Sequence, residues 1–203
     1  MKKKDLASIK EDKNELQETT ISSKHVFDGT LLQVYVDHVK LPDGSQSTRD
    51  WIKHPGASAV VPVFQDGSIM LLKQYRYPAR RLFLEVPAGK IDADETPKTT
   101  ALRELGEESG ISCKNLEQVG SLFPAIGYAD EEIFVFVGWN LDQSDKKTDD
   151  DEFLINHKLH FSDALKMIES GEIKDGKTIC ALTQTYFWWK KHEPFPIDFE
   201  NSN

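Results

Sequence analysis

Apolar residues alternate with polar ones along several short stretches of this chain, which is the pattern of half-buried β-strands. The first alternation runs from Gln33 to Leu41, and a Pro-Asp-Gly-Ser turn at 42–45 leads to an extended piece through Trp51. Asp66-Gly67 suits a tight hairpin between two apolar strands. Further strands are expected later in the chain, and the full set after Trp51 is 59–64, 69–72, 82–86, 116–123, 133–137 and 154–159.

Three segments carry a helical pattern instead, at 96–109, 162–170 and 177–192, and two prolines follow the last one. Short strands interspersed with helices predict an α/β or α+β domain, preceded by a small antiparallel sheet. We expect four parts along the chain: a flexible arm at 1–20, a β element at 21–54, a main domain at 55–193 and a tail at 194–203.

Charge and composition exclude several classes of function. The 203 residues include 25 Lys and Arg against 34 Asp and Glu, a net charge of −9 that disfavours nucleic acid and anionic lipid as partners. The longest apolar run is broken by Ser58 and Pro62 and falls short of the roughly 20 residues of a membrane span. A basic start without an apolar core, together with only two cysteines, predicts a cytoplasmic protein.

One predicted helix carries an unusual number of carboxylates on one side. Glu104, Glu107 and Glu108 stand at positions i, i+3 and i+4, so their like charges repel by about 0.2–0.5 kcal/mol per pair. A hard divalent cation is the natural compensation, because Mg²⁺ prefers oxygen ligands. Arg103 lies four residues before Glu107 and can hold one carboxylate by bidentate hydrogen bonds.

The spacing around this helix is far more specific than a pair of glutamates, which alone is usually a solvated face. With average residue usage, the whole string arises by chance about once in ten million chains of this length. It reads Gly89, five residues, Glu95, seven residues, Arg103-Glu104-Leu105, one residue, Glu107-Glu108, one residue, Gly110-Ile111. The segment matches every fixed position of the signature of the Nudix hydrolases, which the chain therefore resembles.

The resemblance implies an α/β/α sandwich with a mixed sheet and a metal-dependent diphosphate hydrolase. It implies that Mg²⁺, with Mn²⁺ as a substitute, is bound by Glu104, Glu107, Glu108 and the carbonyl of Ala88. Arg103 would orient a carboxylate, and Glu107 counts also as a catalytic residue. Glu95 would have a structural role in the loop.

Beyond the signature, several stretches are similar to the ADP-ribose and nucleoside diphosphate sugar pyrophosphatases: His54-Pro55-Gly56-Ala57, Gln74-Tyr75-Arg76, 84–89, and 171–173 with Asp175, Lys177 and Thr178. This implies hydrolysis of ADP-ribose or a related sugar to a nucleoside monophosphate and a sugar phosphate, by a homodimer built partly through the N-terminal sheet.

Arg76 is the best candidate to offset the diphosphate charge. Trp51 is a candidate for stacking on the base, with Arg49 as a polar contact nearby.

The remaining candidates come from the same resemblance. Substrate contacts include Glu85, Gly127 and Glu131, and the acid that activates water falls on Asp150 or Glu152. Ile126 stands where ADP-ribose specialists commonly have proline, which leaves GDP-mannose-type sugars and dinucleotides such as NADH as alternative substrates. A nucleotide-sugar sensing module without catalysis is the alternative from another class.

Overall fold

The computed structural model describes residues 13–144 and 153–200. Contacts divide the chain into two compact units. The smaller unit contains the chain up to His54 together with residues 125–130, and the larger contains 55–124 and the chain from Glu131 onward. In the part of the chain that is described, no helix is long and apolar enough to cross a membrane.

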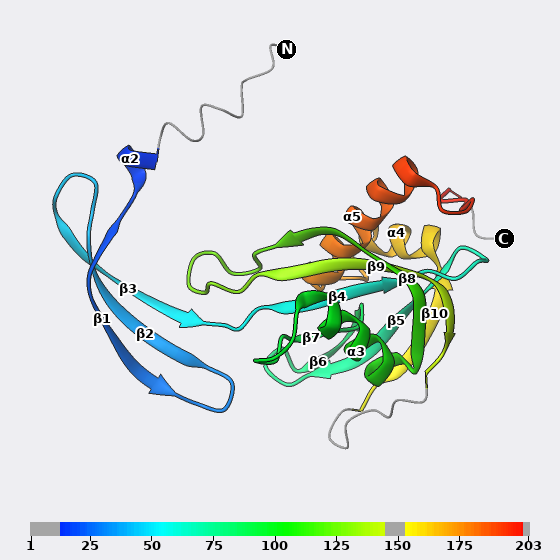
Figure 1. Ribbon diagram of the computed structural model, residues 1–203, viewed down its shortest axis with the longest axis horizontal. Helices are drawn as coiled ribbons and strands as arrows, with labels where there is room; N and C mark the ends of the chain where they lie inside the picture. The colour runs from blue at the N-terminus through cyan, green and yellow to red at the C-terminus, as the bar shows by residue number, and fades with distance from the viewer. Residues whose placement is uncertain (1–12, 145–152, 201–203) are drawn as a thin grey trace, which may run out of the picture. The chain divides into compact units, whose positions relative to one another are not determined.

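The smaller unit is a three-stranded antiparallel sheet in the order β1-β2-β3, preceded by the short helix α2 (Lys13–Leu16) (Figure 1). Its strands are β1 (Thr19–Asp28), β2 (Gln33–Lys40) and β3 (Gln46–Lys53). The turn between β2 and β3 has Gly44 at a φ of 87°, as its sequence predicts. β1 is exposed along its whole length, so no buried face marks it in the sequence.

The larger unit contains two sheets, and its central one is mixed. That sheet has the order β7-β4-β9-β8, with β4 parallel to β9 and the other pairs antiparallel. The second sheet has the order β10-β5-β6 and is antiparallel. The bounds are β4 (Ala57–Pro62), β5 (Ser68–Arg76), β6 (Arg81–Glu85), β7 (Ala88–Lys90), β8 (Ile111–Leu122), β9 (Ile133–Gln143) and β10 (Ile155–His160).

The expected hairpin at Asp66-Gly67 is only partly correct. The turn forms, with Gly67 at a φ of 77° and its N–H donating to the Phe64 carbonyl at 3.0 Å. The strands on either side then separate into different sheets after one bridge between Val63 and Ile69. β4 is already paired on both edges, by β7 and β9, so β5 pairs with β6 and β10 instead.

β4 is buried on both sides because helices cover both faces of the central sheet. Ala59 and Val61 belong to the core cluster that includes α4 (Phe161–Glu169) and α5 (Gly176–His192). Val60, between them, points to the other cluster, with Leu105 of α3 (Pro97–Ser109). The unit is therefore an α/β/α sandwich with a mixed sheet, which confirms the expected fold class (Figure 1).

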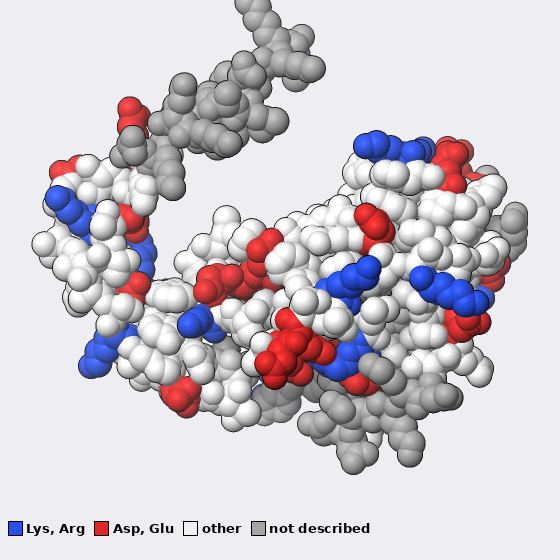
Figure 2. Space-filling model, viewed as in Figure 1, with Lys and Arg blue, Asp and Glu red and all other residues white. Residues whose placement is uncertain are grey.

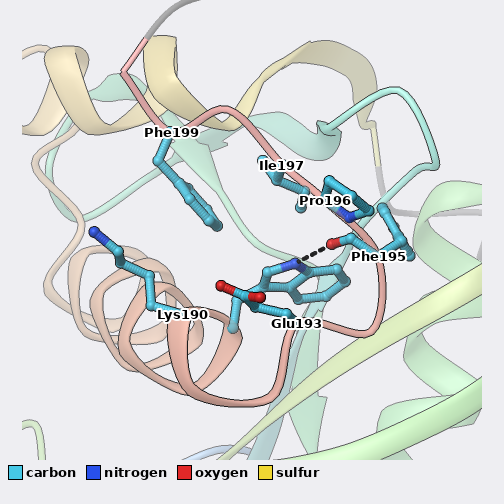
Figure 3. Close-up of a pocket in the computed structure, with 7 residues that line it drawn as sticks. Lys190, Glu193, Phe195, Pro196, Ile197 and Phe199 are labelled. Carbon is cyan, nitrogen blue, oxygen red and sulfur yellow. Dashed lines mark hydrogen bonds between the residues drawn. The ribbon is translucent and has the colours of Figure 1, made fainter.

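The segment after α5 folds back onto the helix (Figure 3). The indole N–H of Trp189 donates to the Phe195 carbonyl at 3.0 Å, and the two rings meet edge to face at 4.9 Å. Phe199 makes similar contacts with Phe161 at 5.1 Å and Tyr186 at 5.0 Å. This segment and α5 together line a cavity of about 230 Å³.

Candidate active site

Local sequence sets both ends of α3, the helix that carries the glutamates. Thr96 is the N-cap: its hydroxyl accepts from the Thr99 N–H at 3.2 Å, and the Thr99 hydroxyl accepts from the Thr96 N–H at 2.8 Å. Pro97 occupies the first turn, and Gly110 ends the helix with a left-handed φ of 68°. The helix boundaries are therefore those that the residue types predict.

Arg103 gathers three carboxylates around one guanidinium group. Its Nη1 donates to Glu104 at 2.7 Å and to Glu107 at 3.1 Å, while Nε and Nη2 donate to Glu95 at 2.8 and 2.9 Å. Hydrogen bonds from Arg103, and next from Thr100, lower the pKa of Glu95 from 4.5 to about 2. The pKa of Arg103 is raised in return, first by its bond to Glu95.

The strand β7 packs directly against the carboxylates of α3. The Glu104 carboxylate lies so close to the Cα of Gly89 that a methyl group there would overlap it. One residue earlier, the N–H of Ala88 donates to Glu108 Oε2 at 2.8 Å. Glycine at 89 is therefore a steric requirement of this arrangement, and the strand and helix of the signature meet at these residues.

The donor set suits a hard divalent cation. Glu104 and Glu108 are only 9% and 7% exposed, and a buried carboxylate needs compensating positive charge. Arg103 supplies one positive charge to three glutamates, Glu95, Glu104 and Glu107. Among the described residues no group of three His, Cys, Asp or Glu side chains lies close enough to hold a metal ion. Arg103 binds the Glu104 carboxylate, and the Ala88 N–H binds that of Glu108.

A second charged cluster lies at the end of β6. Arg76 donates through Nε and Nη2 to the two oxygens of Glu85, at 2.8 and 2.6 Å. Lys177 donates to Glu85 Oε2 at 2.7 Å and to Asp175 at 2.8 Å. Burial raises the pKa of Glu85, but Arg76 and Lys177 outweigh burial and lower it overall. The pKa of Asp175 is lowered in the same way, with Lys177 opposing burial.

Residues 86–88 connect Glu85 of the second cluster to Gly89 beside α3, and each of the three makes a hydrogen bond to another element. The N–H of Val86 donates to the Thr178 hydroxyl at 3.0 Å, and the Pro87 carbonyl accepts from the Val60 N–H at 2.9 Å. Ala88 then binds Glu108. The sequence marked Asp175, Lys177 and Thr178 only through the resemblance and gave them no role, because only the folded chain brings the start of α5 beside β6.

The other candidate contacts fall in different places. Arg49 pairs with Glu18 and Trp51 stacks on Tyr35, with ring centroids 5.0 Å apart, all in the smaller unit. The indole N–H of Trp51 is buried and has no hydrogen-bond partner among the described residues. Gly127 also belongs to the smaller unit, and an added Cβ there would meet open space.

Three further candidates remain. Glu131 is half-buried in the larger unit. Asp150 and Glu152 lie outside the described residues.

Comparison with known proteins agrees with this geometry. The NUDIX domain matches residues 53–182, and the N-terminal domain of nucleoside diphosphate sugar hydrolases matches residues 18–52. The chain is 41% identical over 169 residues to an ADP-ribose pyrophosphatase of Bacillus subtilis, covering 82% of this chain and 91% of that protein. It is 38% identical over 168 residues to a methanol dehydrogenase activator of Bacillus methanolicus, with 82% and 91% covered.

A solved structure of an ADP compounds hydrolase has the same fold. Its TM-score is 0.78 at 21% identity, and the match covers 89% of this chain and 98% of that one. The signature residues gathered on α3, the two domain matches and this shared fold agree. The chain belongs to the Nudix hydrolase family, with the N-terminal domain of nucleoside diphosphate sugar hydrolases.

Proposed function

We propose that this protein hydrolyses the diphosphate bond of ADP-ribose or a related nucleoside diphosphate sugar, with Mg²⁺ as its metal and Mn²⁺ as a substitute. The observation that carries the proposal is the cluster of Glu104, Glu107 and Glu108 on α3. Arg103 binds the first two, the Ala88 N–H binds Glu108, and Glu104 lies against Gly89. The 41% identity to an ADP-ribose pyrophosphatase supports the choice of substrate. The products from ADP-ribose would be AMP and ribose 5-phosphate.

Each residue has a distinct part in this proposal. Glu104, Glu107, Glu108 and the carbonyl of Ala88 would hold the metal, which supplies charge neutralisation and a more acidic water. Arg103 fixes the orientation of the Glu104 and Glu107 carboxylates by hydrogen bonds. Glu107 is also a candidate to accept the proton of the attacking water, as are the acids Asp150 and Glu152 of the loop outside the described residues.

The substrate itself needs positive charge and an aromatic surface. Arg76 is half-exposed and reaches solvent from the end of β5, so it can bind the diphosphate beside the metal. Trp51 has a buried, unpartnered indole N–H among the described residues, which supports a polar contact there, with Arg49 as a second contact to the base. Gly127 stays a predicted substrate contact, and Glu131 a predicted site residue near the metal or the terminal ribose.

The test is direct. Purified protein incubated with Mg²⁺ and ADP-ribose should release AMP, detected by ion-exchange chromatography, and EDTA should abolish the release. Glu107→Gln and Glu108→Gln should each lower kcat at least about 100-fold, because each removes charge from the metal site. Glu117→Gln, at an exposed position of β8, is the matched control. Near-normal turnover in both signature variants would overturn the proposal.

The same assay distinguishes ADP-ribose from the alternative substrates. GDP-mannose and NADH, run beside ADP-ribose at equal concentration, test the alternatives that Ile126 leaves open. A sensing module would bind these compounds without cleaving any of them, so calorimetric binding in the absence of product would favour that function instead.

A second candidate function rests on the relative named a methanol dehydrogenase activator. The match covers 82% of this chain and 91% of that protein. We infer from this likeness that the protein stimulates a methanol dehydrogenase. The test is to add it to such an enzyme and to follow the rate of alcohol oxidation. An unchanged rate at equimolar protein would remove this candidate.

We also propose that the protein is a cytoplasmic homodimer. Every residue of β1 is exposed, including Ile21, Val26 and Phe27, so one edge of the small sheet presents apolar side chains. Edge strands of this kind pair or become covered in stable assemblies.

A further inference from the structure

The carboxylate of Glu85 is shared by two cations. Its Oε1 accepts from Arg76 Nε at 2.8 Å, and its Oε2 accepts from Arg76 Nη2 at 2.6 Å and from Lys177 Nζ at 2.7 Å. Both oxygens are therefore used by the protein itself. Glu85, proposed from sequence as a substrate contact, is placed as the link between Arg76 and Lys177.

The side chain of Arg76 is more exposed to solvent than that of Lys177. The side chain of Arg76 is 44% exposed, whereas those of Glu85 and Lys177 are 5% and 15% exposed. The bonds to Glu85 use Nε and Nη2, and Nη1 makes no hydrogen bond to the described residues. Arg76 thus has one edge fixed to the protein and another available for an anion.

Lys177 is itself fixed by the start of α5. Its Nζ donates to Asp175 Oδ2 at 2.8 Å, and Asp175 is the N-cap of α5, accepting from the Thr178 N–H at 3.0 Å. The Thr178 hydroxyl also donates to Asp175 at 2.7 Å. A continuous series of hydrogen bonds therefore runs from the first turn of α5 through Lys177 and Glu85 to Arg76.

Removing Lys177 would change both charge and geometry. Buried Glu85 and half-buried Asp175 would lose the cation that they share, leaving Arg76 as the ion-pair partner of Glu85 among the described residues, and a buried carboxylate that loses a partner is strongly unfavourable. Arg76 would turn inward to both carboxylates, and its outer edge would lose its alignment. Misplacing a binding group by about 1 Å is enough to lower rates substantially.

We propose that Lys177 is a positioning residue that aims the guanidinium of Arg76 at the substrate diphosphate through their shared partner Glu85. This inference rests on the proposed function for the identity of the ligand. The geometric part, that Lys177 sets the orientation of Arg76, holds with or without catalysis.

The geometric part is tested by NMR of ¹⁵N-labelled protein. The Nε–Hε signal of Arg76, assigned by its loss in Arg76→Lys, should be protected from exchange because Nε donates to Glu85. In Lys177→Met this signal should shift and exchange at least about fivefold faster, and Lys177→Arg should restore it. Lys174→Met, at an exposed lysine just before α5, is the matched control. An unchanged Arg76 signal in Lys177→Met would overturn the proposal.

The functional part is tested by a double-mutant cycle. Calorimetry of ADP-ribose binding in EDTA should show about tenfold weaker binding for Arg76→Ala and about fivefold for Lys177→Met. The double variant should stay within about twofold of Arg76→Ala, because Lys177 acts through Arg76. With Mg²⁺, KM should rise more than kcat falls.

The outcomes are separable. Multiplicative losses in the double variant would show that Lys177 contacts the ligand itself and would overturn the positioning role. A wild-type protein that cleaves none of the sugars would overturn the proposed function. If the Arg76 signal still responds to Lys177→Met in that case, the structural link between the two side chains stands. Thermal unfolding of each variant checks that the fold is retained.

Discussion

Gly89 shows how much the site depends on single residues. Its missing side chain is the space that the Glu104 carboxylate occupies, and the Glu104 carboxylate in turn is held by Arg103. In the sequence, Gly89 stands out only through its spacing to the glutamates. The steric reason for it becomes visible only when β7 lies against α3, as the structure shows.

Gly89→Ala should therefore displace Glu104 without unfolding the protein. We expect kcat for ADP-ribose to fall at least about tenfold and calorimetric Mn²⁺ affinity to weaken in parallel, because the carboxylate must move away from its ligand position. Gly176→Ala, where no heavy atom would lie within 4 Å of the new methyl group, should keep wild-type values. Equal rates for the two variants would contradict the assigned role of Gly89.

At the scale of elements, α3 was predictable in detail because its determinants are local. The capping residue, the first-turn proline and the terminal glycine each act within a few residues of the helix end. Ala101 and Leu105, four residues apart, are fully buried, as their spacing predicts. β1 has no buried face to mark it, and the partners of β4 and β5 depend on strands far away in the sequence.

The segment after α5 gives an element-scale prediction. Phe199 is half-buried between Phe161 and Tyr186, so Phe199→Ala should lower the free energy of unfolding by about 1–2 kcal/mol. Urea denaturation measures the change, and kcat should stay as in the wild type because the proposed catalytic residues lie elsewhere. Phe187→Ala removes a ring that is 66% exposed and should cost less. Equal losses would contradict the packing role of this segment.

At the scale of the whole molecule, the two units differ in how they are stabilised. The larger unit has two buried clusters, whereas Val39 is the one buried residue in the three described strands of the smaller unit. A small sheet with so little core gains stability from being covered. This difference supports a second copy of the chain as the partner of the smaller unit.

Light scattering at micromolar concentration should give twice the mass of the chain, about 46 kDa from the 23.1 kDa of one copy. Replacing Ile21 and Val26 of β1 by Asp should shift the mass towards the monomer, because charges on an edge strand oppose pairing. Phe187→Asp, at a more exposed apolar position of the larger unit, should leave the mass unchanged. A monomeric wild-type protein would refute the dimer.

The sequence alone determined the ends of α3 and the side of the helix that carries the glutamates, because capping and helical periodicity act between neighbouring residues. The order of strands and helices predicted a mixed α and β domain, and the family resemblance implied the sandwich. Tertiary structure decided the rest. Glu85 and Lys177 are 92 positions apart, and Gly89 meets Glu104 only where a strand crosses a helix. Such contacts depend on which strands pair and which helix covers them, and no local pattern of side chains encodes that choice.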